Sequence, residues 1–176
     1  MMETAKYIWM DGKMVEWDKA QVHVLSHSLH YGGGVFEGIR CYQTNDEKTA
    51  LFRPKDHIKR LFYSAKAIEL EVPFTQEDLF DAILNLVREN NLKSGYIRPF
   101  IFSGYGKMGL RPKGAEVNAC IACWPWGSYL GEELIKLKIS SYMRIHPKST
   151  DIQAKISGHY ANSILASQEI AKEGFH

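Results

Sequence analysis

The fold is decided first at the start of the chain, by the stretch Tyr7-Ile8-Trp9-Met10-Asp11-Gly12-Lys13-Met14-Val15-Glu16. Its centre, Asp11-Gly12, is a dipeptide that accommodates the two positive φ angles of a tight hairpin turn. Apolar and aromatic side chains on both sides of this dipeptide favour extended backbone. We therefore predict that the chain opens with a β-hairpin in which 7–10 pairs with 13–16.

Further along, the strand pattern returns in several segments. A polar stretch at 44–48 reads as a hairpin loop, and a Gly-rich segment at 104–114 separates two longer apolar runs. The segments that we predict as strands are 35–43, 51–53, 96–103 and 117–124.

Two amphipathic helices are predicted between these strands. Pro54 suits a first helical position, and the apolar residues that follow it recur at helical spacing: Ile58, Leu61, Phe62, Ala65 and Ile68. The second helix begins at Thr75, whose hydroxyl can cap it with Asp78 three residues later, and ends at Asn90-Asn91. Its predicted buried stripe is Leu79, Phe80, Ile83, Leu86 and Val87.

The order of strands, two helices and more strands favours an α+β fold over a doubly wound parallel sheet. We predict a small two-layer α/β domain over residues 1–126, an interdomain hinge over 127–133, and the first part of a larger α+β, β-barrel-like domain over 134–176. Within this last part we expect a strand at 137–145 and a helix at 157–172. Because so short a segment cannot close a core, we expect the chain to be the front part of a longer protein.

Composition excludes several classes of function. Apolar residues make up 45% of the chain and charged residues 24%, as in globular proteins. The charge of +2 is spread without a basic block, which argues against nucleic acid as a partner. No apolar run is long enough to span a membrane, and the first residues lack the apolar segment of a signal peptide. We therefore expect a cytoplasmic protein that acts on small molecules.

The cysteines and histidines do not predict a metal site. Cys120 and Cys123 have C-x-x-C spacing, but they lie in a predicted buried strand, where positions three apart face opposite sides, and no second such pair follows. His27 and His30 are also three apart, and neither they nor His57 form a convergent ligand set. We interpret them as ordinary loop or core histidines.

An amine and a phenol lie five positions apart in Ala154-Lys155-Ile156-Ser157-Gly158-His159-Tyr160. A lysine amine forms a Schiff base with a carbonyl only when it is unprotonated, and the small or apolar neighbours of Lys155 suit a buried amine. Most lysines are solvated surface charges, so the stretch alone does not decide between a reactive lysine and an ordinary one.

Arginines among aromatic residues suggest a site for an acidic ligand. On the strand at 96–103, alternation places Arg98 on one face with Tyr96, Phe100 and Phe102. A guanidinium there needs a carboxylate, supplied either by a small acid or by a structural ion pair with a residue such as Glu37. Arg40 likewise shares a predicted face with Phe36 and Tyr42. Arg60, off the apolar stripe of its helix, reads locally as a solvated cation.

Taken together, these residues resemble the branched-chain amino acid aminotransferases, which are fold-type IV pyridoxal-phosphate enzymes. The resemblance covers practically the whole chain. The stretches that carry it are His30-Tyr31-Gly32, Val35-Phe36-Glu37-Gly38-Ile39-Arg40, His57-Ile58-Lys59-Arg60-Leu61, Tyr96-Ile97-Arg98-Pro99 and Ala154-Lys155. The segment 156–159 departs from the family's more glycine-rich turn after the lysine.

The resemblance implies a role for each matching residue. Lys155 would be the catalytic lysine that carries pyridoxal 5'-phosphate covalently and shuttles protons. Tyr160 would hydrogen-bond the cofactor's phenolic oxygen, and Arg60 would bind its phosphate, in place of the local interpretation above. The residues expected to line the substrate pocket are Tyr31, Phe36, Arg40, Tyr96 and Arg98. Of these, Arg98 and Tyr31 would help to accommodate the second carboxylate of glutamate or 2-oxoglutarate.

The implied activity is transamination of leucine, isoleucine and valine with 2-oxoglutarate, in a homodimer or higher homo-oligomer. Alternatives with the same fold are a D-amino-acid aminotransferase and an aminodeoxychorismate lyase, and a non-catalytic interaction module is an alternative of another class. The family's acidic partner for the pyridine nitrogen would lie beyond His176, so we expect the 176-residue polypeptide alone to have little or no activity.

Overall fold

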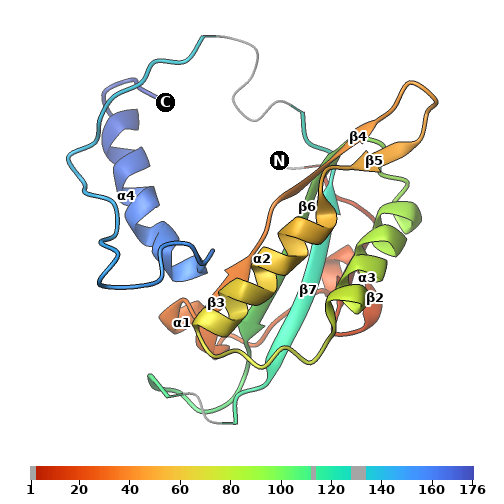
Figure 1. Cartoon of the computed structure of the whole chain (residues 1–176), viewed down its shortest axis with the longest axis horizontal. Helices are drawn as coiled ribbons and strands as arrows, with labels where there is room; N and C mark the ends of the chain where they lie inside the picture. Colours follow the sequence, from red (N-terminus) through yellow and green to blue (C-terminus); the bar gives the residue numbers. More distant parts are fainter. Residues whose placement is uncertain (1–2, 112–113, 128–133) are drawn as a thin grey trace.

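The computed structural model describes residues 3–111, 114–127 and 134–176. Runs of strands and runs of helices follow one another along the chain (Figure 1). The strands are β1 (Tyr7–Met10), β2 (Lys13–Glu16), β3 (Gly34–Phe36), β4 (Ile39–Gln43), β5 (Thr49–Leu51), β6 (Gly95–Ser103) and β7 (Val117–Trp124). The helices are η1 (Trp17–Lys19), α1 (His27–Tyr31), α2 (Pro54–Ala67), α3 (Gln76–Glu89), η2 (Ser157–His159) and α4 (Tyr160–Ala171).

The strands form one antiparallel sheet in the order β2-β1-β7-β6-β4-β5, and β3 pairs with β6 beside β4. The predicted hairpin is confirmed, because Tyr7 pairs with Glu16 and both turn residues, Asp11 and Gly12, have positive φ. The longest pairing joins β6 to β7 from Tyr96–Trp124 to Ser103–Val117. The strands β6 and β7 therefore form the centre of the sheet.

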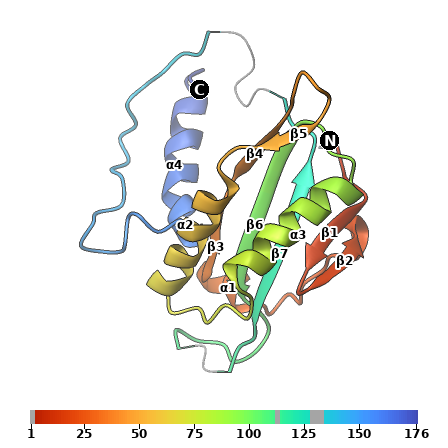
Figure 2. The same ribbon diagram turned by 45° about the vertical axis from the view of Figure 1, so that its right-hand side comes forward.

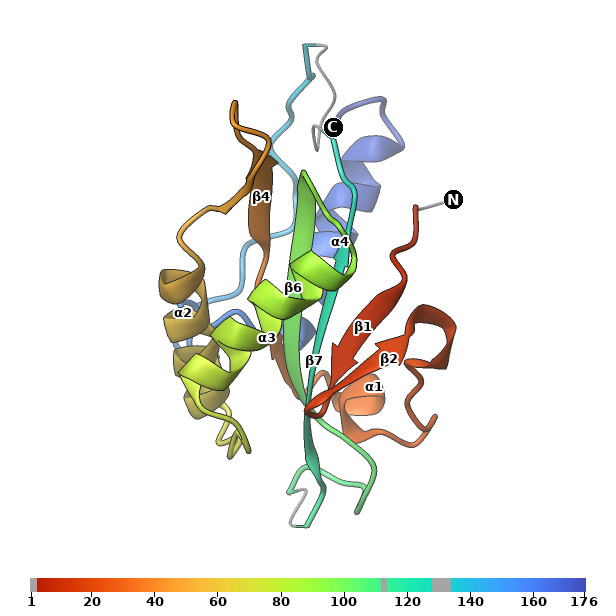
Figure 3. The same ribbon diagram turned by 90° about the vertical axis from the view of Figure 1, so that its right-hand side faces the viewer.

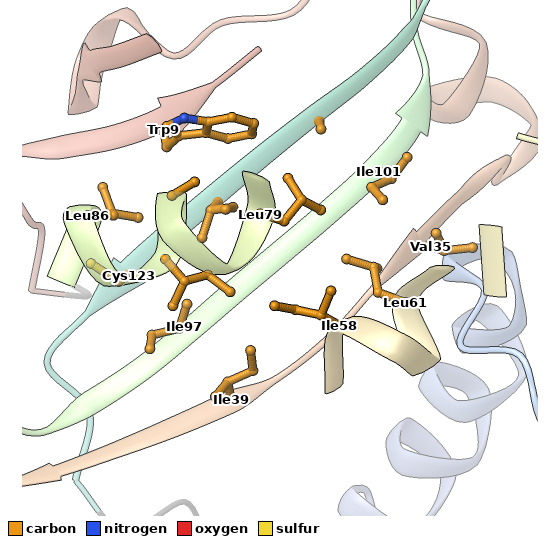
Figure 4. Close-up of a cluster of buried hydrophobic side chains, with 14 of the residues drawn as sticks. Trp9, Val35, Ile39, Ile58, Leu61, Leu79, Leu86, Ile97, Ile101 and Cys123 are labelled. Carbon is orange, nitrogen blue, oxygen red and sulfur yellow. The ribbon is translucent and has the colours of Figure 1, made fainter. Parts of the chain in front are cut away.

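Helices α2 and α3 cover one face of this sheet (Figure 2). The predicted cap of α3 is confirmed: the Thr75 hydroxyl accepts from the Asp78 amide, and the Asp78 carboxylate accepts from the Thr75 amide. Pro54 occupies the first position of α2, as predicted. The apolar stripes of both helices pack on the inward side chains of the sheet (Figure 4); the core includes Ile58, Leu61, Leu79, Leu86, Ile39, Ile97, Ile101 and Cys123.

The side chains that alternate with the buried ones along each strand lie on the opposite face of the sheet. In β6, Ile97 and Ile101 are buried beneath the helices, whereas Tyr96, Arg98 and Phe100 are only partly buried. In the view of Figure 3, α2 and α4 lie on opposite sides of the sheet. The C-terminal segment therefore meets the face that carries the arginines and aromatic residues.

Some expectations about strands and helices were wrong, wholly or in part. The predicted strand over 35–43 is broken between Phe36 and Ile39, because the chain shifts there from β3 to β4. The five-residue helix α1 was not predicted. Residues 137–145 are not a strand, since no described segment pairs with them in a sheet. The predicted helix at 157–172 begins with the 3₁₀ turn η2.

The predicted division into domains stays a prediction. Most of the expected hinge, 128–133, lies outside the described residues. Within the ranges that are described, no helix combines the length and the hydropathy needed to cross a bilayer.

Candidate active site

The Lys155 amine lies among aromatic groups on the sheet face away from α2 and α3. Its Nζ is 2.6 Å from the hydroxyl oxygen of Tyr160, the first residue of α4. The same nitrogen lies 4.7 Å from the centre of the Phe36 ring, at the end of β3, and that ring is 4.9 Å from the Tyr160 ring. All three residues were predicted for the site from the family resemblance, and the fold brings them together.

The backbone of Lys155 is fixed from two sides. Its amide donates to Oγ of Ser64, a buried residue of α2, at 2.9 Å. Its carbonyl accepts a hydrogen bond from the Phe36 amide at 3.1 Å, and Ile156 forms an isolated antiparallel bridge with Val35. The lysine segment thus extends the sheet beside β3, which holds the base of the Lys155 side chain in a defined position.

A close backbone contact fixes the turn that follows the lysine. The Gly158 amide donates to the Gly32 carbonyl at 3.2 Å, and the Ser157 hydroxyl lies 2.9 Å and 3.0 Å from the carbonyl oxygens of Gly32 and Gly34. Gly32 has φ +68°, and a Cβ on it would fall 2.7 Å from the Gly158 Cα. Only glycine fits there without strain. The segment 156–159 departs from the family's more glycine-rich turn, but it keeps Gly158 and therefore still lets the backbone at Gly158 approach Gly32 closely.

Arg98 lies next to the lysine, as part of the same cluster. Its guanidinium carbon is 4.6 Å from the centre of the Phe36 ring and 5.1 Å from that of Tyr96, and Nη2 donates to the Tyr96 hydroxyl at 3.1 Å. Arg98 Nε is buried and has no hydrogen-bond partner within the described part of the chain. The alternative ion pair with Glu37 is not formed, because Glu37 binds other groups. A buried, uncommitted donor at this position suits an acidic ligand.

Arg40 stands at the far end of the same face. It donates to the carbonyl oxygens of Gly127 and Trp126, at 3.0 Å and 3.1 Å. The Trp126 ring in turn lies 4.9 Å from the ring of Tyr96. The predicted pocket residue Arg40 therefore binds the backbone beside the aromatic cluster. Trp126 is a neighbour in this cluster that was not predicted from the sequence.

Arg60 binds the carboxylate of Glu37. Both Nε and Nη2 of Arg60 donate to Glu37, the latter at 2.8 Å, and the His57 Nδ1 lies 2.8 Å from the same carboxylate. The prediction from local pattern, a purely solvated cation, was wrong. Burial by itself would raise the pKa of Glu37, but the hydrogen bonds from Arg60 and His57 outweigh it and lower that pKa. The pKa of Arg60 is raised, mainly by the hydrogen bond to Glu37 and further by the charge of Glu37, which together outweigh burial.

Tyr31 is the predicted site residue that the fold does not bring to this cluster. It lies on α1 with an exposed side chain, and its ring contacts among the described residues are with His27 and His30. Its assignment to the substrate pocket stays a prediction, because none of the contacts given above joins Tyr31 to Lys155, Phe36 or Arg98.

Two residues of the candidate site were not predicted from the sequence to belong to it. Glu37 and Ser64 are both fully buried polar side chains, and both connect predicted site residues to the scaffold. Ser64 follows Arg60 by one helical turn, so its place on the inward face of α2 was a usable signal. Nothing in the local pattern indicated that it would contact a residue 91 positions away.

A cavity of about 470 Å³ adjoins the cluster on the same sheet face. Its walls are mostly apolar and include Phe100, Phe102, Gly158 and Cys120, but none of the candidate cofactor-binding residues. Burial raises the pKa of Cys120 to about 12, and that of Cys123, on the other face of β7, to about 11. Thiols with such pKa values are not nucleophiles at neutral pH, so we place the candidate site at Lys155 rather than in this cavity.

The donor set at the cluster fits a phosphorylated aromatic aldehyde. Lys155 offers an amine for a carbonyl carbon, Tyr160 offers a phenol within hydrogen-bonding distance of that amine, and Arg60 offers a half-exposed guanidinium for a phosphate. Among the described residues no group of three or more histidine, cysteine, aspartate or glutamate side chains could hold a metal ion.

Comparison with known proteins gives a consistent result. A branched-chain-amino-acid aminotransferase from Pseudomonas aeruginosa is 47% identical over 95% of this chain and 55% of its own length. The crystal structure of the Escherichia coli branched-chain amino acid aminotransferase superposes with a TM-score of 0.93 at 43% identity, covering 97% of this chain and 58% of that one. The T.th. branched-chain amino acid aminotransferase in complex with N-(5'-phosphopyridoxyl)-L-glutamate gives a TM-score of 0.92 at 41% identity, covering 98% of this chain and 57% of that one.

The chain thus spans a little over half the length of these relatives, and it shares their fold throughout. The predicted α+β, fold-type IV class is confirmed. Residues 34–176 also match the family model for amino-transferase class IV, and they include Phe36, Arg98 and Lys155. The chain belongs to the class IV aminotransferases.

Proposed function

We propose that this chain forms the cofactor-binding front part of an enzyme that transfers amino groups between leucine, isoleucine or valine and 2-oxoglutarate, with pyridoxal 5'-phosphate as cofactor. The observation that carries the proposal is the line of contacts from the Lys155 amine through the Phe36 ring to Arg98. It places a candidate nucleophilic amine, an apolar wall and an acid-binding cation side by side.

The residues of this chain would divide the work at the cofactor. Lys155 would attach the cofactor and then move the α-proton of the substrate with Nζ, which the backbone bonds to Ser64 and Phe36 hold in place. Tyr160 would donate to the phenolic oxygen of the cofactor, and Arg60 would bind the phosphate. When bound, pyridoxal phosphate supplies an electron-withdrawing ring that accepts the electron pair left at the α-carbon.

The substrate side must accept both an apolar side chain and an acid. Phe36 and Tyr96 provide aromatic walls, and Arg98 lies over both rings with Nε uncommitted among the described residues. A branched aliphatic side chain would lie against the rings, and the distal carboxylate of glutamate would bind the guanidinium. The relative solved with a phosphopyridoxyl-glutamate adduct supports this choice of acid.

The remaining predictions are part of the same proposal. Residues 1–126 would form a small domain and residues 134–176 would begin the cofactor-binding domain, joined through 127–133. The position of α4 apart from the helices that cover the sheet supports this division (Figure 1). We further propose a cytoplasmic homo-oligomer in which Tyr31 belongs to the substrate pocket.

The proposal is tested by the substrates that the protein uses. The protein expressed from its own gene, mixed with pyridoxal 5'-phosphate and 2-oxoglutarate, should form glutamate from L-leucine, L-isoleucine and L-valine. Turnover of D-alanine instead would favour the D-amino-acid aminotransferase, and release of pyruvate from aminodeoxychorismate would favour the lyase. Absence of all three activities, together with absence of cofactor binding, would favour an interaction module.

A further inference from the structure

A buried carboxylate lies behind the predicted phosphate-binding arginine. Glu37 occupies the break between β3 and β4, and its side chain is fully buried. Its own amide donates to the Pro99 carbonyl at 2.9 Å, which ties it to the central strand β6. The carboxylate accepts hydrogen bonds from Arg60, His57 and the Gly38 amide.

Burying a carboxylate is costly unless donors replace the water that it loses. Here helix α2 supplies the donors from two side chains three positions apart, His57 and Arg60, which therefore lie on the same side of the helix. An ionised carboxylate only accepts hydrogen bonds, so His57 must carry its proton on Nδ1. Glu37, His57 and Arg60 thus form one cluster in which donors from α2 and from the Gly38 amide satisfy the buried carboxylate.

The cluster limits the positions that the Arg60 guanidinium can take. Arg60 has a half-exposed side chain, which alone would sample many rotamers. Glu37 binds Nε and Nη2 together, a two-point contact that sets both the place and the plane of the guanidinium. Among the described residues this leaves Nη1 uncommitted, and Ser64, one turn further along α2, connects the Arg60 carbonyl to the Lys155 amide through its hydroxyl.

We propose that Glu37 is a positioning residue for cofactor binding: it holds the Arg60 guanidinium so that its remaining N–H groups meet the phosphate, with His57 as the third member of the cluster. The inference rests on the proposed function, because it presumes that Arg60 binds the cofactor phosphate. In this proposal Glu37 itself touches neither cofactor nor substrate. Its effect is confined to the part of the binding energy that comes from the phosphate.

Replacing Glu37 by glutamine tests the geometry. The amide keeps the size of the side chain, but one of its two ends becomes a donor that faces Arg60 or His57, which are themselves donors. The two-point contact is then lost. We expect E37Q to bind pyridoxal 5'-phosphate roughly tenfold more weakly. Binding of pyridoxal, which lacks the phosphate, should stay the same.

The measurement is the ratio of the dissociation constants for pyridoxal and pyridoxal 5'-phosphate, followed by absorbance on the protein expressed from its own gene. The variants are E37Q, R60Q, the double variant, and E71Q as a control at an exposed glutamate. The proposal predicts that E37Q lowers the ratio, that E37Q has no further effect in the R60Q background, and that E71Q resembles the wild type.

Three results would overturn the inference: an unchanged ratio in E37Q, an equal loss of affinity for both ligands, or additive effects in the double variant. If E37Q does not fold, R60K answers the same question at a half-exposed position. Lysine keeps the charge but cannot make the two-point contact, so a wild-type ratio in R60K also contradicts the inference. A wild-type protein that does not prefer the phosphorylated ligand would contradict the proposed function itself.

Discussion

The backbone amide of Lys155 donates a 2.9 Å hydrogen bond to the side-chain oxygen of Ser64, 91 positions earlier in the chain. The same hydroxyl donates to the Arg60 carbonyl at 2.8 Å, one turn back along α2. One buried hydroxyl therefore connects the helix of the predicted phosphate-binding arginine to the backbone of the predicted catalytic lysine.

Replacing Ser64 by alanine should loosen the lysine segment. The Lys155 amide would lose its acceptor in a part-buried setting, which costs about 1–3 kcal/mol. Hydrogen exchange followed by mass spectrometry should show faster exchange in peptides that contain residue 155 in S64A. Peptides from β7 should exchange as in the wild type.

A matched control for this change is Ser94→Ala. The Ser94 hydroxyl also accepts from a backbone amide, that of Gln43 at 2.8 Å, but at an exposed position where water can replace it. S94A should leave exchange at residue 155 unchanged. Equal protection of this amide in S64A and S94A would contradict the role given to Ser64.

Gly32→Ala should separate the lysine segment from the sheet. Alanine at a positive φ costs about 1–2 kcal/mol by itself. At Gly32 the added Cβ would also meet the Gly158 Cα at 2.7 Å, and two backbone segments cannot easily move apart. We expect a larger fall in the free energy of unfolding for G32A, measured in urea, than for a glycine in open space.

Gly114 provides that comparison, because it has φ +81° and no atom lies within 4 Å of a Cβ built on it. G114A carries the backbone strain without the contact. If G32A and G114A lose the same stability, the contact between Gly32 and Gly158 contributes nothing.

The stability of the protein should depend on pH through Glu37. Its pKa is lower in the folded state than the ordinary value of 4.5, because hydrogen bonds from Arg60 and His57 outweigh burial. The unfolded chain therefore binds more protons between the two pKa values, and the stabilisation, complete above pH 4.5, is lost as pH falls through the folded pKa. Urea unfolding at pH 7, 5, 4 and 3 should show wild type more stable than E37Q at neutral pH, with a gap that narrows in acid. A constant gap would contradict this assignment.

Tyr160→Phe should weaken cofactor binding without moving its point of attachment. Phenylalanine keeps the ring contact with Phe36 but removes the hydroxyl 2.6 Å from the Lys155 amine. Loss of one hydrogen bond corresponds to about 1 kcal/mol, or roughly a fivefold weaker affinity for pyridoxal 5'-phosphate. Absorbance titration measures this, and Tyr142→Phe, at an exposed tyrosine, is the control. An unchanged affinity in Y160F would remove Tyr160 from the site.

Local signals predicted the scaffold well. The Asp11-Gly12 turn, the capping pair Thr75 and Asp78, and Pro54 at the start of α2 each act within a few residues, and all three appear as expected. The alternation in β6 likewise predicted that Arg98 and Tyr96 would share a face. These features depend on neighbours in sequence.

Contacts between distant segments were harder to predict. Local pattern gave Arg60 as a solvated cation, since nothing near it in sequence shows that the break after Phe36 carries Glu37 to α2. Residues 137–145 have the alternation of a strand, but a strand also needs a partner, and the described residues supply none. The grouping of Lys155, Phe36 and Arg98 came from the resemblance to a family rather than from the pattern of the residues.

The most direct test of the proposed function is to find which lysine takes up the cofactor. The protein is mixed with pyridoxal 5'-phosphate, reduced with borohydride, digested and analysed by mass spectrometry. We predict a single phosphopyridoxyl group on Lys155, lost in Lys155→Ala while circular dichroism stays unchanged. A label on another lysine, or a label spread over many lysines with Lys155 no more reactive than the rest, would contradict it.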